Sequence, residues 1–413
     1  MKDIAALLVR ALIVAACCFA TWMSIRHARA DLAADAWPRV PALERALHIE
    51  PENVELVVMD ALARSDGDDP SPSLNEQLLA AHRMDPFNSR LLIALGLRAE
   101  FRGDNASAEK YLQQATEVDH SFTPAWTLAG FCVRNGQPDK FWPMAKRCLS
   151  LEPLLFDPRP VYDLAWRVTG DPAKIRGMLP QTGPRLIDYL NYLMDSSRID
   201  AAAAIWPEAV NALDPAVPGD IGLALAYCDF MAANNRTSSA VRAWNQLVDR
   251  NLIRSGHLDP ANGISIADPD FSFPPAKGLF NWHTADAGGV YVTSGASALR
   301  FELDGDEPEA LTLLSTTAAV FPEKKYRLEW KYDASQLSAL RDRGFEIRIL
   351  QQPGNVVTEC GPFLGAGESG NCAFTTGPDI QRAAIELRYA RASGTVRVKG
   401  ALRISGIRLG LGS

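Results

Sequence analysis

The spacing of hydrophobic residues changes twice along the chain. Residues 4–25 are almost uniformly apolar, and from there to about residue 253 apolar residues recur every three or four positions, the period of an amphipathic helix. Beyond residue 268 they alternate with polar residues in short runs, the period of a half-buried strand. Such runs are YRLEWKY (326–332), FEIRIL (345–350), IELRY (385–389) and TVRVKG (395–400), in which we expect Leu328, Ile347, Leu387 and Val398 to point inward. The pattern predicts a membrane-length segment, a helical region and a β region, in that order.

Prolines mark the ends of helical runs at a nearly constant interval. Pro51 and Pro86 lie 35 residues apart, and Pro153 follows after a further 67 residues, about twice that interval. Each proline comes directly after an acidic residue, where it ends the helix because it cannot continue one. A fixed period of this length predicts an array of stacked helical units.

The unit that begins at Ser89 resembles the tetratricopeptide repeat, a pair of antiparallel helices. Gly96 and Ala108 are small where the two helices would cross, and Gly103 lies in the turn RGDN between them. The resemblance implies an α-solenoid whose first helices line a groove for a protein partner. For Trp126 the alternative is packing between neighbouring units. The positions expected in the protein-binding groove are Arg90, Glu100, Phe101, Trp126 and Arg134.

The β region resembles a jelly roll of the carbohydrate-binding-module type, the galactose-binding-like sandwich. The matching stretches are DPDFSF at its start, then FNW, GGVYV and GASALRFEL, and a closing RISGIRLGL. The resemblance implies an antiparallel β-sandwich and a glycan as ligand. Ser272 stands where that family often has a calcium-binding glutamate, so we expect no calcium site. The positions expected to contact a glycan are Trp282, His283, Tyr291, Arg348 and Arg388, with Trp282 alternatively capping the core.

The first 30 residues allow two interpretations. Ile4–Ile25 is long enough for one membrane-spanning helix of ~20 residues, which would make the segment a signal anchor. Alternatively, Ala28-Arg29-Ala30 is a signal-peptidase site, and the segment is removed. We favour the anchor because the helical pattern continues without a break. The bulk of the chain is then periplasmic and held at the inner membrane by one span, or soluble in the periplasm after cleavage near Ala30.

Seven cysteines bear on the expectation of export. Cys360 and Cys372 flank a glycine-rich stretch, and an exported location permits a disulfide between them. The sequence is compatible with a disulfide between these two cysteines and also with two free thiols. For Cys132, Cys148 and Cys228 we expect buried free thiols that pack as small hydrophobic residues.

Composition and motifs narrow the function further. A net charge of −7 gives no basic field, which argues against nucleic acid as a partner. The sequence contains no nucleophile elbow, zinc-protease motif, phosphate loop or dinucleotide fingerprint, and its six histidines are scattered. GAGESGN (365–371) lacks the lysine of a phosphate loop and is expected to be a surface loop, and the charged run DGDEPE (304–309) a solvated turn. We expect no catalytic residue, metal or cofactor.

These observations predict a membrane segment over residues 1–30, tetratricopeptide-like helices over 31–255, a linker over 256–267 and a β-sandwich over 268–413. This order of features resembles envelope proteins of Gram-negative exopolysaccharide and O-antigen gene clusters. The resemblance implies a non-enzymatic adaptor that assists assembly or export of a cell-surface polysaccharide. The alternative is a glycan-modifying enzyme or accessory factor with its site on the sandwich.

Overall fold

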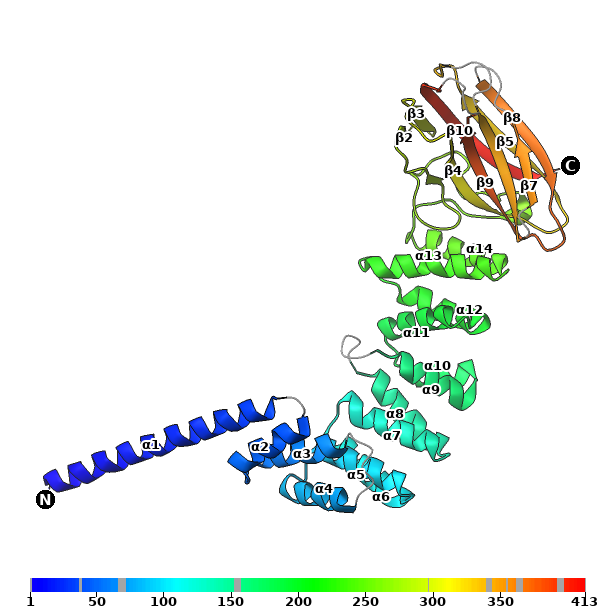
Figure 1. Ribbon diagram of the computed structural model, residues 1–413. Coiled ribbons are helices and arrows are strands. Elements are labelled where there is room, and N and C mark those ends of the chain that lie inside the picture. Colours follow the sequence, from blue (N-terminus) through cyan, green and yellow to red (C-terminus); the bar gives the residue numbers. More distant parts are fainter. Residues whose placement is uncertain are drawn as a thin grey trace. The chain divides into compact units, whose positions relative to one another are not determined.

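The computed structural model describes residues 2–36, 39–65, 72–151, 157–295, 297–338, 344–353, 356–361, 367–391 and 397–412. The chain separates into two compact units, residues 1–180 and residues 181–413. The first contains helices only, whereas the second combines helices with two β-sheets (Figure 1). The linker expected at residues 256–267 lies within the second unit.

The first unit is a series of helices in which consecutive members pack as antiparallel pairs, as the repeat pattern predicts (Figure 1). The pairs of best-defined sequence signature are α5 with α6 and α7 with α8. The described helices are α1 (Lys2–Ala34), α2 (Arg39–Ile49), α3 (Val54–Ser65), α4 (Pro72–Met84), α5 (Ser89–Phe101), α6 (Asn105–Val118), α7 (Phe122–Arg134), α8 (Pro138–Leu149), α9 (Arg159–Thr169) and α10 (Pro172–Met178).

Small residues let the helices of a pair approach closely. A Cβ atom added at Gly96 would lie 2.8 Å from Cδ2 of Leu112 and 3.3 Å from the main-chain oxygen of Ala108. Gly103 has φ +80° in the turn between α5 and α6, a conformation that L-residues rarely adopt. The Asp104 side chain caps α6 by accepting a hydrogen bond from Ser107 N at 3.1 Å. These local features explain why residues 89–118 fold as a helix pair.

The second unit begins with four more helices and continues into the sheets. Trp244 on the last helix packs edge-on against Phe280, with ring centroids 5.4 Å apart, and donates from Nε1 to Gly256 O at 3.2 Å. A fragment cut at residue 268 would therefore lose the indole that covers Phe280. The helices are α11 (Gly183–Asp195), α12 (Ile199–Ala212), α13 (Pro218–Ala233) and α14 (Thr237–Asp249).

Two antiparallel five-stranded sheets form the sandwich of the second unit (Figure 1). The first sheet has the strand order β1-β4-β9-β6-β7, and the second sheet has the order β2-β3-β10-β5-β8. The described strands are β1 (His283–Thr284), β2 (Val290–Ser294), β3 (Leu299–Leu303), β4 (Ala310–Ala319), β5 (Lys325–Asp333), β6 (Phe345–Gln352), β7 (Val356–Cys360), β8 (Gly367–Thr375), β9 (Arg382–Ala390) and β10 (Gly400–Leu411).

The sandwich core follows the alternation read from the sequence. Leu328, Ile347, Leu387 and Val398, expected to point inward, are all buried. Two local expectations were wrong. Residues 397–399 of the expected strand 395–400 lie outside any strand, and the preceding residues 392–396 lie outside the described part of the chain. Residues 367–371 of the expected glycine-rich loop form the first half of β8.

The strand β8 forms despite its glycines because a neighbouring indole replaces the missing side chain. Gly370 lies directly opposite Trp330 of β5, and a Cβ atom there would lie 2.3 Å from Cε2 and Cζ2 of that indole. The ring thus fills the space beside an edge-strand glycine. A disulfide joins Cys360 of β7 to Cys372 of β8 and so links the edges of the two sheets. Cys132, Cys148 and Cys228 are buried free thiols, as expected.

Candidate functional site

The first unit carries an open cavity on the exposed sides of three helices. Its volume is about 460 Å³, and its walls come from α5, α7 and α9, the first helices of three successive pairs. Most of the lining is apolar, and two arginines contribute to the rest of it. The lining residues are Leu97, Trp126, Thr127, Gly130, Val133, Arg134, Leu164 and Arg167.

Helical spacing explains why α7 dominates this cavity. Trp126, Gly130 and Val133 follow one another at intervals of four and three residues, which places them on one face of the helix. Gly130 has no side chain to fill the space beside the indole. Leu97 on α5 contributes an aliphatic side chain that is 41% exposed. A large aliphatic residue left this open beside a cavity is available to a partner.

Trp126 is half-buried. This exposure is intermediate between the two roles expected from the sequence, which are contact with a partner and packing between repeat units. Its ring stacks on Phe122 with centroids 5.9 Å apart and planes 15° apart. The same indole lines the cavity. The residue therefore packs against its own helix with one face and contributes to the cavity wall, so substitution tests binding only alongside a stability measurement.

Arg134 is held in a two-pronged ion pair that crosses from α7 to α5. Its Nε and Nη2 donate to Oε1 and Oε2 of Glu100, each at 2.8 Å, and Asn135 Nδ2 donates to the same carboxylate at 3.2 Å. The hydrogen bonds that Arg134 donates to Glu100 are the main cause that raises the pKa of Arg134, with burial opposing it. Because the charge of Arg134 is already neutralised by Glu100, this residue mainly forms part of the cavity wall and attracts an acidic ligand only weakly.

The other two expected groove residues lie outside the cavity lining in the described part of the chain. Arg90 is exposed in the first turn of α5, two turns from Leu97 along the helix. Phe101, the last residue of α5, is 83% exposed. Conversely, Leu164 and Arg167 of α9 line the cavity, although the sequence did not identify them because the repeat signature fades after Pro153. Arg167 donates from Nε to Asp163 O at 3.4 Å.

The indole of Trp282 is not available to a sugar. It is 3% exposed, packs against Phe271 with ring centroids 5.1 Å apart, and donates from Nε1 to Asp268 O at 2.6 Å. A stacking platform needs an open ring face, so the expectation of a glycan contact at Trp282 is corrected to the alternative, a core position. The tryptophan closes the sandwich beside the DPDF turn.

The remaining residues expected to contact a glycan lie on different parts of the sandwich. His283 is on β1 and contacts Gly278 O through Nε2 at 2.9 Å. Tyr291 is exposed on β2 of the second sheet. Arg348 and Arg388 lie on the first sheet, near Glu359 at 3.8 Å and Glu346 at 3.7 Å respectively. Arg348 and Arg388 are diagonal neighbours on the adjacent strands β6 and β9, because Arg388 lies opposite Glu346 and Arg348 lies opposite Glu386, whereas Tyr291 lies on the other sheet.

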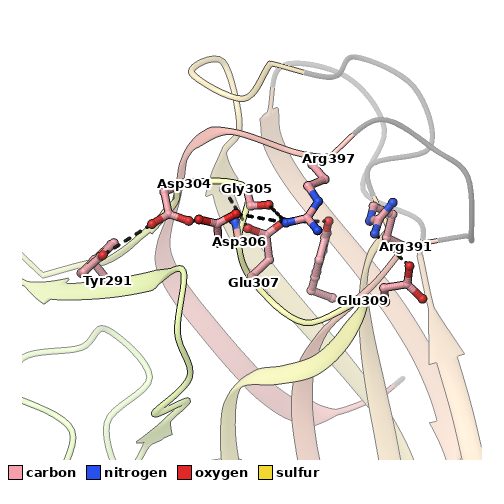
Figure 2. A network of polar contacts seen from close by, with 9 residues as sticks. Tyr291, Asp304, Gly305, Asp306, Glu307, Glu309, Arg391 and Arg397 are labelled. Carbon is pink, nitrogen blue, oxygen red and sulfur yellow. Dashed lines mark hydrogen bonds and ion pairs between the residues drawn. The ribbon is translucent and has the colours of Figure 1, made fainter.

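The charged turn at residues 304–309 is a structural network, seen in Figure 2. Glu307 is buried and accepts hydrogen bonds from Gly305 N at 3.0 Å and Tyr389 Oη at 3.2 Å. Burial, followed by this carboxylate, raises the pKa of Tyr389. The turn is thus only partly the solvated one expected.

Two arginines and a tyrosine tie the same turn to its neighbours. Arg397 binds Gly305 O and reaches Asp306 at 3.1 Å, and Arg391 pairs with Glu309 at 2.9 Å (Figure 2). Tyr291 donates to Asp304 at 3.4 Å. These carboxylates serve the turn itself. Within the described residues, no group of three or more His, Cys, Asp or Glu side chains is placed to hold a metal ion.

The solved structures that align with this chain do so only at low similarity, and they include helical-repeat proteins. They also include the enzymatically active domain of a bacteriophage CBA120 tailspike protein, which aligns at TM-score 0.27 with 17% identity, over 37% of this chain and 22% of that one. No protein-family model matches the sequence, and no curated protein matches it. A crystal structure of MamA protein aligns at TM-score 0.32 with 17% identity, over 42% of this chain and 93% of that one. PilW, described as a type IV pilus biogenesis factor, aligns at TM-score 0.26 with 14% identity, over 49% and 96%. At TM-scores below 0.5 these likenesses assign neither a family nor a function.

Proposed function

We propose that the chain is a non-enzymatic envelope adaptor whose helical repeats dock a segment of a partner protein. The observation that carries the proposal is the open apolar cavity on α5, α7 and α9. A partner segment would place an aliphatic or aromatic side chain beside Leu97 and Trp126. A carboxylate on the same segment would meet Arg167, since the charge of Arg134 is already matched by Glu100.

The partner meets the adaptor at a membrane, in this proposal, because α1 is retained as a signal anchor. Ala11–Ala34 has the length and composition of a membrane span. The end of the same helix is part of the folded unit: Ala30 is fully buried in a cluster with Leu43, Ala46 and Leu56. Cleavage after Ala30 would remove one wall of this cluster.

Polar contacts also fix the end of α1 to the second helix. The buried carboxylate of Glu50 lies 2.8 Å from His27 Nδ1 and 3.8 Å from Arg26 Nε. Arg26 Nε donates to Ile49 O at 3.0 Å. Removing residues 1–30 would take both of these partners away from Glu50. The intact mass of the membrane-extracted protein tests retention: a chain starting at Asp31 would contradict it.

The role in assembly or export of a cell-surface polysaccharide rests on the resemblance in feature order, with the bulk of the chain in the periplasm. The disulfide Cys360–Cys372 supports an oxidising location. A glycan-modifying factor remains the alternative function, and it would place its site on the sandwich.

The docking proposal is tested with full-length protein in detergent and a panel of synthetic twelve-residue peptides. One set carries Leu or Phe next to Asp or Glu, and a matched set carries Lys in place of the acids. We expect the acidic apolar peptides to bind, and Trp126→Ala to weaken them by roughly thirtyfold, as for an aromatic hot spot. Trp142→Ala is the matched control, since Trp142 is a half-buried indole of the same unit on α8, outside the cavity lining.

Three results would count against docking of a partner protein in this cavity. Equal binding by both tryptophan variants would place the peptide elsewhere. A fall in melting temperature for Trp126→Ala without a change in affinity would make the residue a packing element only. In cells, a photo-crosslinker at Leu97 that captures a second copy of this chain, while one at Lys110 on α6 captures nothing, would identify the occupant as the chain itself.

A further inference from the structure

The outer face of the second sheet carries a polar cleft that is separate from every residue expected to bind a glycan. Its volume is about 310 Å³, at the small end of ligand pockets. Three strands and the turn before β1 supply its walls. The lining residues are Asp270, Arg327, Glu329, Trp330, Lys331, Ser369, Gly370, Asn371, Ser405, Gly406 and Arg408.

The cleft is hollow because small residues flank the long side chains of β5. Lys331 pairs with Ser369 on β8 and with Gly406 on β10, so neither neighbour fills the space beside its ammonium group. The register of β10 shifts between Ile404 and Gly406, which leaves Ser405 as an extra residue in the strand. Such a bulge bends the strand and redirects its side chains.

A rigid turn brings Asp270 to the rim. The carboxylate of Asp268 accepts hydrogen bonds from Ser272 N at 2.8 Å and Phe273 N at 2.9 Å, and Ile407 N donates to Pro269 O at 2.9 Å. Asp270 is thereby held against β10, where both of its oxygens accept from Arg408 Nη2, at 2.7 and 2.9 Å. The DPDF stretch thus positions a functional group as well as closing the core.

Charges within the cleft are matched except for one. Arg408 pairs with Asp270, and Arg327 pairs with Glu329 at 3.2 Å. Lys331 makes no ion pair with any residue that the structure describes. Among the described residues that line the cleft, three cations against two carboxylates leave a net charge of +1, located on Lys331, and Ser369, Asn371 and Gly406 line the same cleft.

We propose that this cleft binds the carboxylate-bearing sugar unit of an acidic polysaccharide. Lys331 would take the carboxylate, while Ser369, Asn371 and Glu329 exchange hydrogen bonds with ring hydroxyls. A ligand with one negative charge and many hydroxyls matches a site with one unmatched cation and alternating donors and acceptors. The inference uses a surface of the second unit only and does not depend on peptide docking in the groove.

Calorimetric titration of the full-length protein in detergent tests the proposal with three probes: trigalacturonate, the neutral maltotriose and inorganic phosphate. We expect trigalacturonate to bind in the micromolar to millimolar range and the other two to bind at least tenfold more weakly. Lys331→Ala should weaken trigalacturonate binding about tenfold, the loss of one charge-assisted hydrogen bond. Lys324→Ala removes the same charge from the turn before β5, outside the cleft lining, and should leave binding unchanged.

The result is decided by which probes and variants respond. Equal binding of maltotriose would show that the charge plays no part, and equal binding of phosphate would reduce the site to an anion contact; either overturns the proposal. So does undiminished binding of trigalacturonate by Lys331→Ala. A second variant, Ser369→Trp, fills the cleft from the exposed edge strand and should abolish binding while the unfolding transition of the second unit is retained. Binding that survives this variant also rules the cleft out. Failure of these tests leaves the peptide results of the groove unaffected.

Discussion

The groove of the first unit, which is the cavity on α5, α7 and α9, differs from the cleft of the second unit in the kind of group that has no partner within the protein. In the groove, the ion pair of Arg134 with Glu100 is complete, and the unsatisfied feature is apolar surface at Leu97 and Trp126. In the cleft, the aromatic ring is packed and the unsatisfied feature is the ammonium group of Lys331. Arginine residues near a surface therefore do not by themselves indicate a negatively charged ligand, because their charges can already be paired with carboxylates of the same protein.

The aromatic residues of the two surfaces also differ in what supports them. Trp126 is half-buried on a helix and contacts Phe122. Trp330 is 5% exposed, belongs to the sandwich core and covers Gly370 across a strand pair. We therefore expect changes at the groove to alter binding with little loss of stability, and changes beneath the cleft to do both.

The largest effect is expected for Trp330→Ala. Removing a core indole should lower the free energy of unfolding of the second unit by about 3–5 kcal/mol, through lost burial and the cavity left behind. Chemical denaturation followed by circular dichroism, with the transitions of the two units resolved, measures it. Phe101→Ala, at an exposed site of the first unit, should change stability by no more than about 0.5 kcal/mol. Equal losses of unfolding free energy in the two variants would contradict the expected difference between the two surfaces.

Removing the disulfide is expected to come next. The double variant Cys360→Ser, Cys372→Ser should destabilise the second unit by about 2–3 kcal/mol, because a short loop regains freedom in the unfolded chain. Peptide binding in the groove should not change, whereas trigalacturonate binding should weaken as β8 loosens. A parallel loss of both activities would mean that the two units are not independent in stability.

Two glycine-to-alanine substitutions, one in each unit, should have smaller effects on stability, and only the one in the second unit should be destabilising. Gly370→Ala places a Cβ atom 2.3 Å from the Trp330 ring and should cost about 1–3 kcal/mol. Gly130→Ala meets only the end of the Arg134 side chain, at 3.0 Å, and it favours the helix, so stability should stay level or rise by up to about 1 kcal/mol. Thermal melts of both variants give the comparison, and a reversed order would contradict it.

The smallest effect is expected for Glu100→Gln. Arg134 is 55% exposed, so losing the ion pair should cost no more than about 1 kcal/mol. The freed guanidinium should strengthen binding of acidic peptides and make it more sensitive to salt. Anisotropy titrations at two salt concentrations measure both effects. Unchanged affinity in Glu100→Gln would show that Arg134 does not face the bound peptide.

Local signals in the sequence were sufficient for the helix pairs as far as Pro153 and for most strands, but not for the later helix pairs α9 to α14. Gly96, the RGDN turn and the acidic-proline endings identify helix pairs because those features act within a few residues. The strand β8 was missed because its stability depends on Trp330, which is 40 residues away in sequence from Gly370. Strand propensities count the glycines of this segment as unfavourable, and they take no account of an aromatic ring that packs against a glycine from the neighbouring strand.

Pairing between distant residues limited the site predictions in the same way. Trp282 looked open because its neighbours are loop-forming residues, yet Phe271 and Asp268 enclose it. Glu100 and Arg134 were both expected in the groove, and their separation of 34 residues, one repeat, was a signal that they occupy equivalent ends of neighbouring helices. Asp270 was overlooked because only the packed turn brings it to Arg408.

The unbroken helix α1 has a consequence for the direction in which the groove faces. If residues 4–25 span the bilayer, the helix that ends at Ala34 couples the angular orientation of the first unit to that of the span. One alanine inserted between Trp22 and Arg26 would rotate the groove by about 100° around the helix axis and raise it by about 1.5 Å. Seven inserted residues would bring it back to within about 20° of its original azimuth and raise it by about 10 Å. If a membrane-embedded partner still binds after the second insertion but not after the first, its binding depends on the direction in which the cavity faces and not on the distance of the cavity from the membrane.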